Sequence, residues 1–237
     1  MLLLKPYITF TFKRVDSEEL LKRIYQLRYE VYCQECHFLT ASDYPDGLET
    51  DEYDPFSIHF AAINHDAQVV GTVRLILPNP LGFPLEKRCR LDIDPHKFPR
   101  EKIAEISRLA VSKKYRRRAD DELYGTESYL SVDPWRRRRY PIVVLGLYRT
   151  IYQESKKSGL ALWYAAMEKK LWRALRLYGI HFTKIGKEVD YYGPVAPYLG
   201  VIKELERTVS LHKPELFRYF TKGLEHINLD SEAQELR

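Results

Sequence analysis

The sequence predicts an α/β protein built around one mixed β-sheet. Two strand-like runs, residues 57–63 and 68–77, are joined by a four-residue turn, as in an antiparallel hairpin. From about residue 141, helical and strand-like segments alternate, which is typical of an α/β arrangement. We therefore expect a sheet with antiparallel and parallel pairing, flanked by helices.

The composition is that of a globular protein. Hydrophobic residues make up 45% of the 237 residues and charged residues 30%, which leaves enough apolar side chains for a sizeable core. No run approaches the roughly 18 apolar residues of a membrane span, and no apolar segment has the length of a signal peptide. Three cysteines do not indicate a disulfide framework. We expect a cytoplasmic protein without a transmembrane segment.

The first part of the chain predicts a strand, a helix and a long loop. Residues 6–12 alternate and are rich in β-forming side chains. Asp16 with Glu19 resembles a capping box at the start of a helix. The polar stretch 40–55 is long for a connection, and loops of that length are usually functional or mobile. The apolar stripe of the helix consists of Leu20, Ile24, Leu27 and Val31.

Residues 103–111 predict the central strand. Period-two alternation assigns its side chains to two faces of the sheet. One face is expected to carry Glu105, Ser107, Leu109 and Val111, and the other Ile106, Arg108 and Ala110.

The second half begins with a polar stretch, 115–139, that we interpret as an insertion or lid. Pro141 suits the first turn of a helix, and Gly159 follows its end. A strand, a helix and another strand are expected at residues 160–166, 171–178 and 182–185. Prolines and glycines predict a turn-rich region at 194–200, followed by a helical tail. We expect one domain over residues 1–205 and a helical extension over residues 206–237.

Several motifs, in this order, resemble the GNAT superfamily of N-acyltransferases. They are Arg28-Tyr29-Glu30-Val31-Tyr32, the acidic loop 49–54, Gly71-Thr72-Val73-Arg74-Leu75, Glu105-Ile106-Ser107-Arg108-Leu109, and the run 185–194. The series resembles the branch of acyl-homoserine-lactone synthases and long-chain N-acyl amino acid synthases. It is most similar to the acyltransferases associated with PEP-CTERM/exosortase systems. The resemblance covers roughly residues 15–200 and implies a GNAT fold and N-acyltransferase activity.

The acyl donor implied by the resemblance is a thioester, with no permanently bound cofactor. GNAT enzymes that use acetyl-CoA carry a glycine-containing motif after the central strand, whose amides bind the CoA pyrophosphate. This chain has no glycine in residues 116–121 and places Asp120 and Asp121 there, where they would repel phosphate. We therefore expect acyl carrier protein as the donor's carrier. Acyl-CoA as donor and acetyl-CoA acetylation stay as alternatives.

The acceptor is expected to be an amino acid or a related small amine. Homoserine-lactone synthases usually carry a tryptophan after the first helix, near their S-adenosylmethionine site. This chain has His37-Phe38-Leu39 in that region. A homoserine-lactone synthase that uses S-adenosylmethionine stays as the alternative enzyme.

Glu105 and Ser107 are the candidate catalytic residues. A carboxylate on a cleft-facing strand can take the proton of the acceptor ammonium, but Glu105 could equally form a structural pair with an arginine. Ser107 could bind substrate, and no triad makes it a nucleophile. Backbone N–H groups near Leu109 and Val111 are expected to stabilise the oxyanion.

Three arginines and the acidic loop form the second candidate group. An arginine can hold the carboxylate of an amino acid acceptor with two parallel hydrogen bonds. The alternative is an internal ion-pair network that includes Glu49 and fixes the loop over the cleft. The substrate-binding candidates are Arg28, Arg74, Arg108, Asp51 and Asp54, together with Leu109 and Val111.

Two basic runs offer a binding surface for an acidic carrier protein. The first consists of Lys113, Lys114, Arg116, Arg117 and Arg118, and the second spans residues 136–139. Such runs are most often solvated surface. A non-catalytic binding module is the third alternative. Nucleic acid is not expected as a partner, because the pI is only 8.9 and no known nucleic-acid motif accompanies the arginines.

Two further features have simple interpretations. Cys33-Gln34-Glu35-Cys36-His37 matches the haem-attachment signature, but such attachment normally takes place outside the cytoplasm, where we do not expect this protein. A zinc site is not expected either, because no second Cys/His pair has matching spacing. We therefore expect the two cysteines to be packing residues. A slot for a long acyl chain would need apolar side chains. Its candidates are Val143, Val144, Leu147 and Trp163, which could equally be ordinary core.

Overall fold

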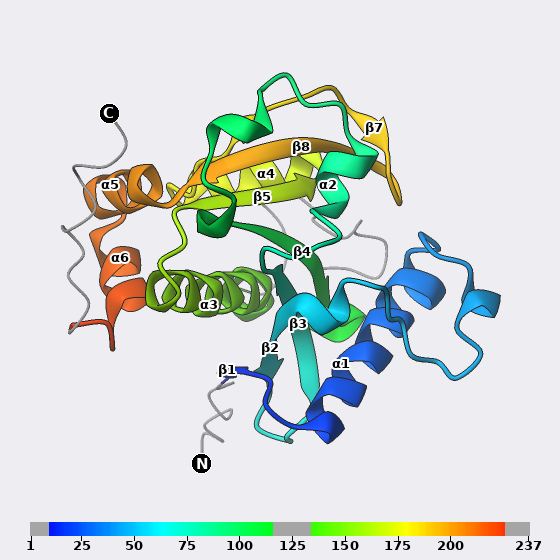
Figure 1. The fold of residues 1–237 in the computed structure, drawn as a ribbon. Coiled ribbons are helices and arrows are strands. Elements are labelled where there is room, and N and C mark those ends of the chain that lie inside the picture. The colour runs from blue at the N-terminus through cyan, green and yellow to red at the C-terminus, as the bar shows by residue number, and fades with distance from the viewer. Residues whose placement is uncertain (1–9, 116–133, 226–237) are drawn as a thin grey trace, which may run out of the picture.

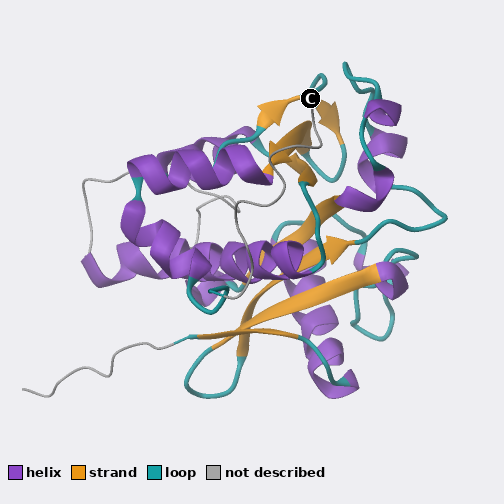
Figure 2. Cartoon of the chain, turned by 60° about the vertical axis from the view of Figure 1, so that its left-hand side comes forward, coloured by secondary structure: helices purple, strands orange, loops and turns teal. Residues whose placement is uncertain are grey.

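The computed structural model describes residues 10–115 and 134–225. A twisted sheet runs through the centre of the molecule, with helices on both of its faces (Figures 1 and 2). The strands are β1 (Thr11–Arg14), β2 (Ser57–Ile63), β3 (Val69–Ile76), β4 (Ile103–Val111), β5 (Leu162–Met167), β6 (Thr183–Lys184), β7 (Val189–Asp190) and β8 (Pro194–Val201). The helices are α1 (Glu18–Tyr29), α2 (Pro84–Arg88), α3 (Pro134–Lys157), α4 (Lys169–Leu177), α5 (Ile202–His212) and α6 (Pro214–Thr221).

The sheet has mixed pairing, as the sequence predicts. Its strand order is β1-β2-β3-β4-β5-β8-β6, and β7 pairs with β8 outside this path. β4 and β5 are parallel, and the other pairs are antiparallel. Because the parallel pair requires a crossover, the chain leaves β4 and returns to β5 through α3.

Helices α1 and α3 cover opposite faces of the sheet. Phe60 and Ala62 of β2 pack in the main core with α3, whereas Ala61 between them packs with α1. The predicted apolar stripe is confirmed, because Leu20, Ile24 and Leu27 of α1 and Val31 directly after it are all buried. The N-cap is Ser17 and not Asp16, since the Ser17 hydroxyl accepts the backbone N–H of Leu20 at 3.3 Å.

The region 194–200 is a strand, and the predicted turn-rich segment is wrong. β8 pairs with β5 from Ala196 to Val201 and with β6 on its other side, so it lies inside the sheet. Pro197 has no backbone N–H to donate, but its carbonyl accepts the N–H of Ile185 at 3.0 Å, so the proline still takes part in backbone hydrogen bonding. At Gly200 a Cβ would come within 2.7 Å of the Phe182 ring, so the glycine allows close packing.

The helix expected to begin near Pro141 begins earlier, at Pro134. The C-terminal helices pack into the same core as the sheet, because Ile202, Leu205, Val209 and Phe220 are buried against it. Within the described residues no helix is both long and apolar enough to cross a bilayer.

Candidate active site

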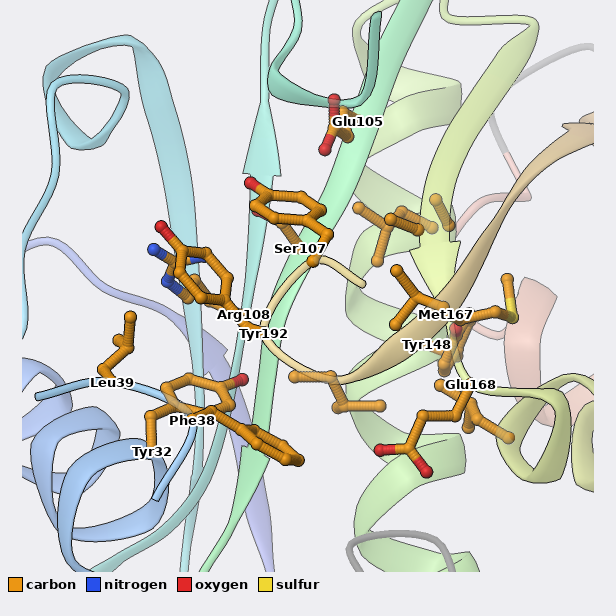
Figure 3. Close-up of a pocket in the computed structure, with 17 residues that line it drawn as sticks. Tyr32, Phe38, Leu39, Glu105, Ser107, Arg108, Tyr148, Met167, Glu168 and Tyr192 are labelled. Carbon is orange, nitrogen blue, oxygen red and sulfur yellow. The ribbon is translucent and has the colours of Figure 1, made fainter. Parts of the chain in front are cut away.

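A cleft opens where β4 and β5 separate. Their parallel ladder runs from Ile103–Leu162 to Ile106–Ala165 and then stops, although both strands continue. The cleft is lined on one side by Glu105 to Leu109 of β4 and on the other by residues 165–168, at the end of β5 (Figure 3). The facing edges of the two strands beyond Ile106 and Ala165 are therefore available to a ligand with amide groups.

A β-bulge in β4 shapes this cleft. Arg74 of β3 pairs with Ser107 and Thr72 with Ala110, so β4 holds one extra residue between these positions. Arg108 lies in the bulge with φ at +51°. The extra residue reverses the alternation: Leu109 and Val111 pack with Ile106 in the core on the α3 side, and Ala110 packs against the α1 side. The predicted face assignment is therefore wrong beyond Ser107.

Arg28 is fully buried at the end of α1 and holds two residues of the acidic loop. Its guanidinium donates to the Glu49 carboxylate and forms two hydrogen bonds to Asp54, of 2.7 and 3.2 Å. Such a planar, two-pronged contact is the geometry that favours arginine over lysine.

Arg74 and Arg108 complete this network. Arg74 donates to Asp51 and to Asp54, the latter at 2.7 Å. Arg108 donates to Glu49 at 3.1 Å and to Asp51 at 2.9 Å. Three arginines thus face three carboxylates. All three arginines have partners within the protein, which is the internal network that the sequence left as an alternative.

The network keeps its carboxylates ionised. Burial alone would raise the pKa of Asp54, but Arg28 and Arg74 outweigh burial and hold this pKa well below its usual range. The pKa values of Glu49 and Asp51 are lowered in the same way, against their burial. His59, beside Asp54, has its pKa lowered to about 4 by burial and is neutral at pH 7.

Glu105 lies at the narrow end of the cleft and is 2% exposed. Burial raises its pKa to about 8, although the carboxylate accepts the backbone N–H of Leu85 at 3.0 Å. Glu105 forms no ion pair with a described residue, so the structural pair with an arginine is not observed. A buried carboxyl that titrates near neutral pH can exchange protons with a substrate.

The other predicted residues occupy different positions around the cleft. Ser107 lines it and accepts a hydrogen bond from Arg74 at 2.9 Å. Leu109 also lines it, whereas Val111 lies in the core. Lys113 and Lys114 are exposed directly after β4. Arg116, Arg117 and Arg118 lie outside the described residues.

The proposed acyl-slot residues do not line the cleft. They are fully or almost fully buried in the main core, and the apolar residues that do line the cleft include Tyr148, Met167 and Leu171. An aromatic rim, defined by Tyr32, Phe38, Tyr191 and Tyr192, closes the opposite side. The Arg108 guanidinium lies over the rings of Tyr32 and Tyr192, at 5.9 and 5.6 Å from their centroids.

The cysteine motif is part of the packing. Cys33 is buried and Cys36 partly buried after α1, where residues 30–35 form a π-helix. Burial raises the pKa of both thiols. No group of three potential metal ligands occurs among the residues that the structure describes.

The sequence interpretation missed Glu168 and the aromatic turn Tyr191–Tyr192. Glu168 is the residue between β5 and α4, and nothing local distinguishes it from an ordinary helix-capping position. Tyr192 has φ at +57°, which is unusual for a non-glycine residue and often marks a functional site. Only the fold brings these residues to the cleft.

Comparisons with known proteins agree with this architecture. Residues 27–125 match the family model of the acetyltransferase (GNAT) domain. No curated protein matches the sequence.

Solved structures with the same fold include two synthases, BjaI and FeeM, and the protein TofI. BjaI, a CoA-dependent acyl-homoserine lactone synthase, is 18% identical with a TM-score of 0.63, over 88% of this chain and 90% of BjaI. FeeM, an N-acyl amino acid synthase from uncultured soil microbes, is 13% identical with a TM-score of 0.59, over 86% and 96%. TofI, solved with an inhibitor and MTA, is 17% identical with a TM-score of 0.58, over 87% and 98%. At these identities the likeness establishes the fold. Residues 27–125 thus resemble a GNAT acetyltransferase domain, and the chain has the GNAT fold.

Proposed function

We propose that this protein transfers a long-chain fatty acyl group from acyl carrier protein to the amino group of an amino acid or related small amine, in the cytoplasm. The observation that carries the proposal is the cleft between β4 and β5, with Glu105 at its narrow end and Arg108 at its rim. The extended phosphopantetheine arm of a carrier contains amides, which suit the unpaired strand edges.

Glu105 is the base in this proposal. Its ionised carboxylate takes one proton from the acceptor ammonium, and the neutral amine attacks the thioester carbonyl carbon. The carbonyl electron pair moves to oxygen, where N–H groups of the bulge near Leu109 stabilise the charge. Collapse of this intermediate breaks the C–S bond, whose electron pair leaves on sulfur, and the amine nitrogen gives its second proton to solvent as the amide forms. A base with a pKa of about 8 is well matched to this step.

The carrier protein is favoured over CoA by charge. Lys113 and Lys114 are exposed shortly after β4, and Arg116, Arg117 and Arg118 follow them in the sequence. An acidic carrier would be attracted to such a run of basic residues, and the effect would weaken with salt. Acyl-CoA is the competing donor.

The direct test supplies purified protein with long-chain acyl carrier protein and a mixture of amino acids. We expect an N-acyl amino acid, identified by mass spectrometry. Methylthioadenosine released from added S-adenosylmethionine would assign a homoserine-lactone synthase instead. Equal turnover of acetyl-CoA without any carrier would contradict the carrier-dependent reaction.

The Glu105→Gln variant tests the base. Because the carboxyl must be ionised to act, we expect kcat/KM of the wild type to rise with pH up to about 8. The variant should lose at least about 100-fold in rate, within the usual range for general-base catalysis. Turnover at the wild-type rate would exclude Glu105 as the base.

A stability measurement separates this effect from unfolding. The folded-state pKa of Glu105 is raised, so ionisation in the fold opposes stability once pH exceeds the unfolded value. We therefore expect Glu105→Gln to unfold at a higher temperature than the wild type at pH 8.

A further inference from the structure

Glu168 is a second carboxyl group in the cleft, on the side opposite the β4 strand that carries Glu105. It directly follows β5 and is the N-cap residue of α4. The carboxylate lies at the wide end of the cleft, near Met167 and Tyr148, whereas Glu105 lies toward the other end (Figure 3). The two acids therefore flank the space between β4 and β5.

The surroundings of Glu168 favour a carboxyl group that holds a proton. It is partly buried; its backbone carbonyl accepts the N–H of Trp172, but within the described part of the chain its carboxylate makes no hydrogen bond or ion pair. Burial alone raises its pKa to about 6. Titratable groups near it include Cys36 after the π-helix, whose pKa is influenced by both Glu168 and Lys113, and Tyr148 of α3. Lys169 and Lys170 follow it in the sequence.

The protonation of Glu168 differs from that of the other acids near the cleft, because no arginine among the described residues is paired with it. Glu49, Asp51 and Asp54 are each paired with arginine and stay ionised. Apolar groups of a bound donor would displace water from Glu168 and raise its pKa further, because burial penalises the charged form. Glu168 is thus the carboxyl whose protonation depends most directly on occupation of the wide end.

We propose that Glu168 is a catalytic acid that gives its proton to the departing sulfur of the acyl donor. This role rests on the proposed N-acyltransferase function. When the C–S bond breaks, its electron pair stays on sulfur, and the Glu168 O–H proton moves to that sulfur to form the thiol. The carboxylate regains a proton from the amide-forming nitrogen through water or from bulk solvent. Because an ordinary thiol has a pKa of about 8.5, transfer from this acid is downhill.

Position assigns this role to Glu168 and not to Glu105. A donor arm that enters between the separated strand edges passes the end of β5 first, where Glu168 stands. Glu105 lies where β4 still pairs with β5, opposite Tyr164. One acid at each end allows one to take a proton from the amine while the other supplies a proton to sulfur.

The test compares Glu168→Gln with wild type on two acyl donors. One donor is a thioester of an alkyl thiol such as N-acetylcysteamine, and the other is a thioester of 4-nitrothiophenol, whose anion needs no proton to leave. We expect the variant to lose at least about 10-fold in kcat on the alkyl donor and less than about 2-fold on the aryl donor. Equal losses on both donors would overturn the role, because they would indicate a structural or binding effect.

The controls keep this result separate from the proposed function. Glu188→Gln changes an exposed glutamate outside the cleft and should leave both rates unchanged. If the wild type forms no N-acyl product from these donors or from long-chain acyl carrier protein, the proposed function fails and this role with it. Binding of a non-hydrolysable acyl-pantetheine ether near pH 7 should take up protons in the wild type, with less uptake in Glu168→Gln. Equal uptake by both proteins would also overturn the assignment.

Discussion

At the scale of single residues, the centre of this site consists of six charged side chains, three positive and three negative, whose charges cancel. Arg28, Arg74 and Arg108 are matched by Glu49, Asp51 and Asp54, and most of these side chains are buried. Removing one member leaves its partners charged and unpaired in a medium of low polarity, which costs more than the ion pair itself stabilises. The network therefore anchors the acidic loop to α1, β3 and β4.

Arg28→Met should lower the free energy of unfolding by about 3–5 kcal/mol, because Glu49 and Asp54 lose a shared partner. Urea denaturation monitored by circular dichroism measures this loss. The matched control is Arg14→Ala, which removes an exposed pair with Glu154 and should cost less than about 1 kcal/mol. Similar losses in both variants would show that the network does not stabilise the fold.

At the scale of elements, the strand ends decide the shape of the site. The bulge in β4 turns Arg108 toward the acidic loop, and the separation of β4 from β5 opens the cleft. The turn between β7 and β8 brings Tyr192 over Arg108, and Gly193 of this turn lies against the Phe38 ring. The aromatic rim thus depends on how β7 and β8 are held at the sheet edge.

Gly186 lies where the chain before β7 packs closely against Arg90, in the segment before β4, and against Pro197 of β8. A Cβ at this position would lie 2.4 Å from the Arg90 carbonyl oxygen and 2.7 Å from Pro197, so the backbone would have to shift. Gly186→Ala should therefore lower stability by about 1–3 kcal/mol, and it should weaken acceptor binding through the rim. Lys187→Ala, at an exposed neighbour, is the control and should change neither property. Thermal unfolding and KM for the acceptor are the measurements.

At the scale of the whole molecule, the C-terminal helices and the sheet share one core. Phe220 of α6 packs against Tyr152 of α3, with ring centroids 5.8 Å apart, and both belong to the main core. A shared core predicts one cooperative unfolding transition.

Phe220→Ala should lower stability by about 3–5 kcal/mol, the usual cost of removing a buried aromatic ring. The control is Leu211→Ala in α5, where the side chain is 75% exposed and the expected loss is below about 0.5 kcal/mol. Denaturation should show a single transition in the wild type. Two separate transitions would make the segment after residue 205 an independent unit.

The sequence by itself determined the mixed α/β class, the GNAT resemblance and the apolar stripe of α1, because regular periodicity reports which face of an element is buried. It also singled out Glu105 and the three arginines, because they lie in the motifs that resemble the GNAT branch.

Only the tertiary structure decided three points. The bulge at Arg108 breaks the period-two pattern, so alternation placed Leu109 and Val111 on the wrong face. β8 is a strand because β5 lies beside it, despite its prolines and glycine. Glu168 joins the cleft, and Glu105 has its pKa raised, through burial by residues distant in sequence. Bulges, strand order and burial depend on non-local contacts, which a local pattern does not record.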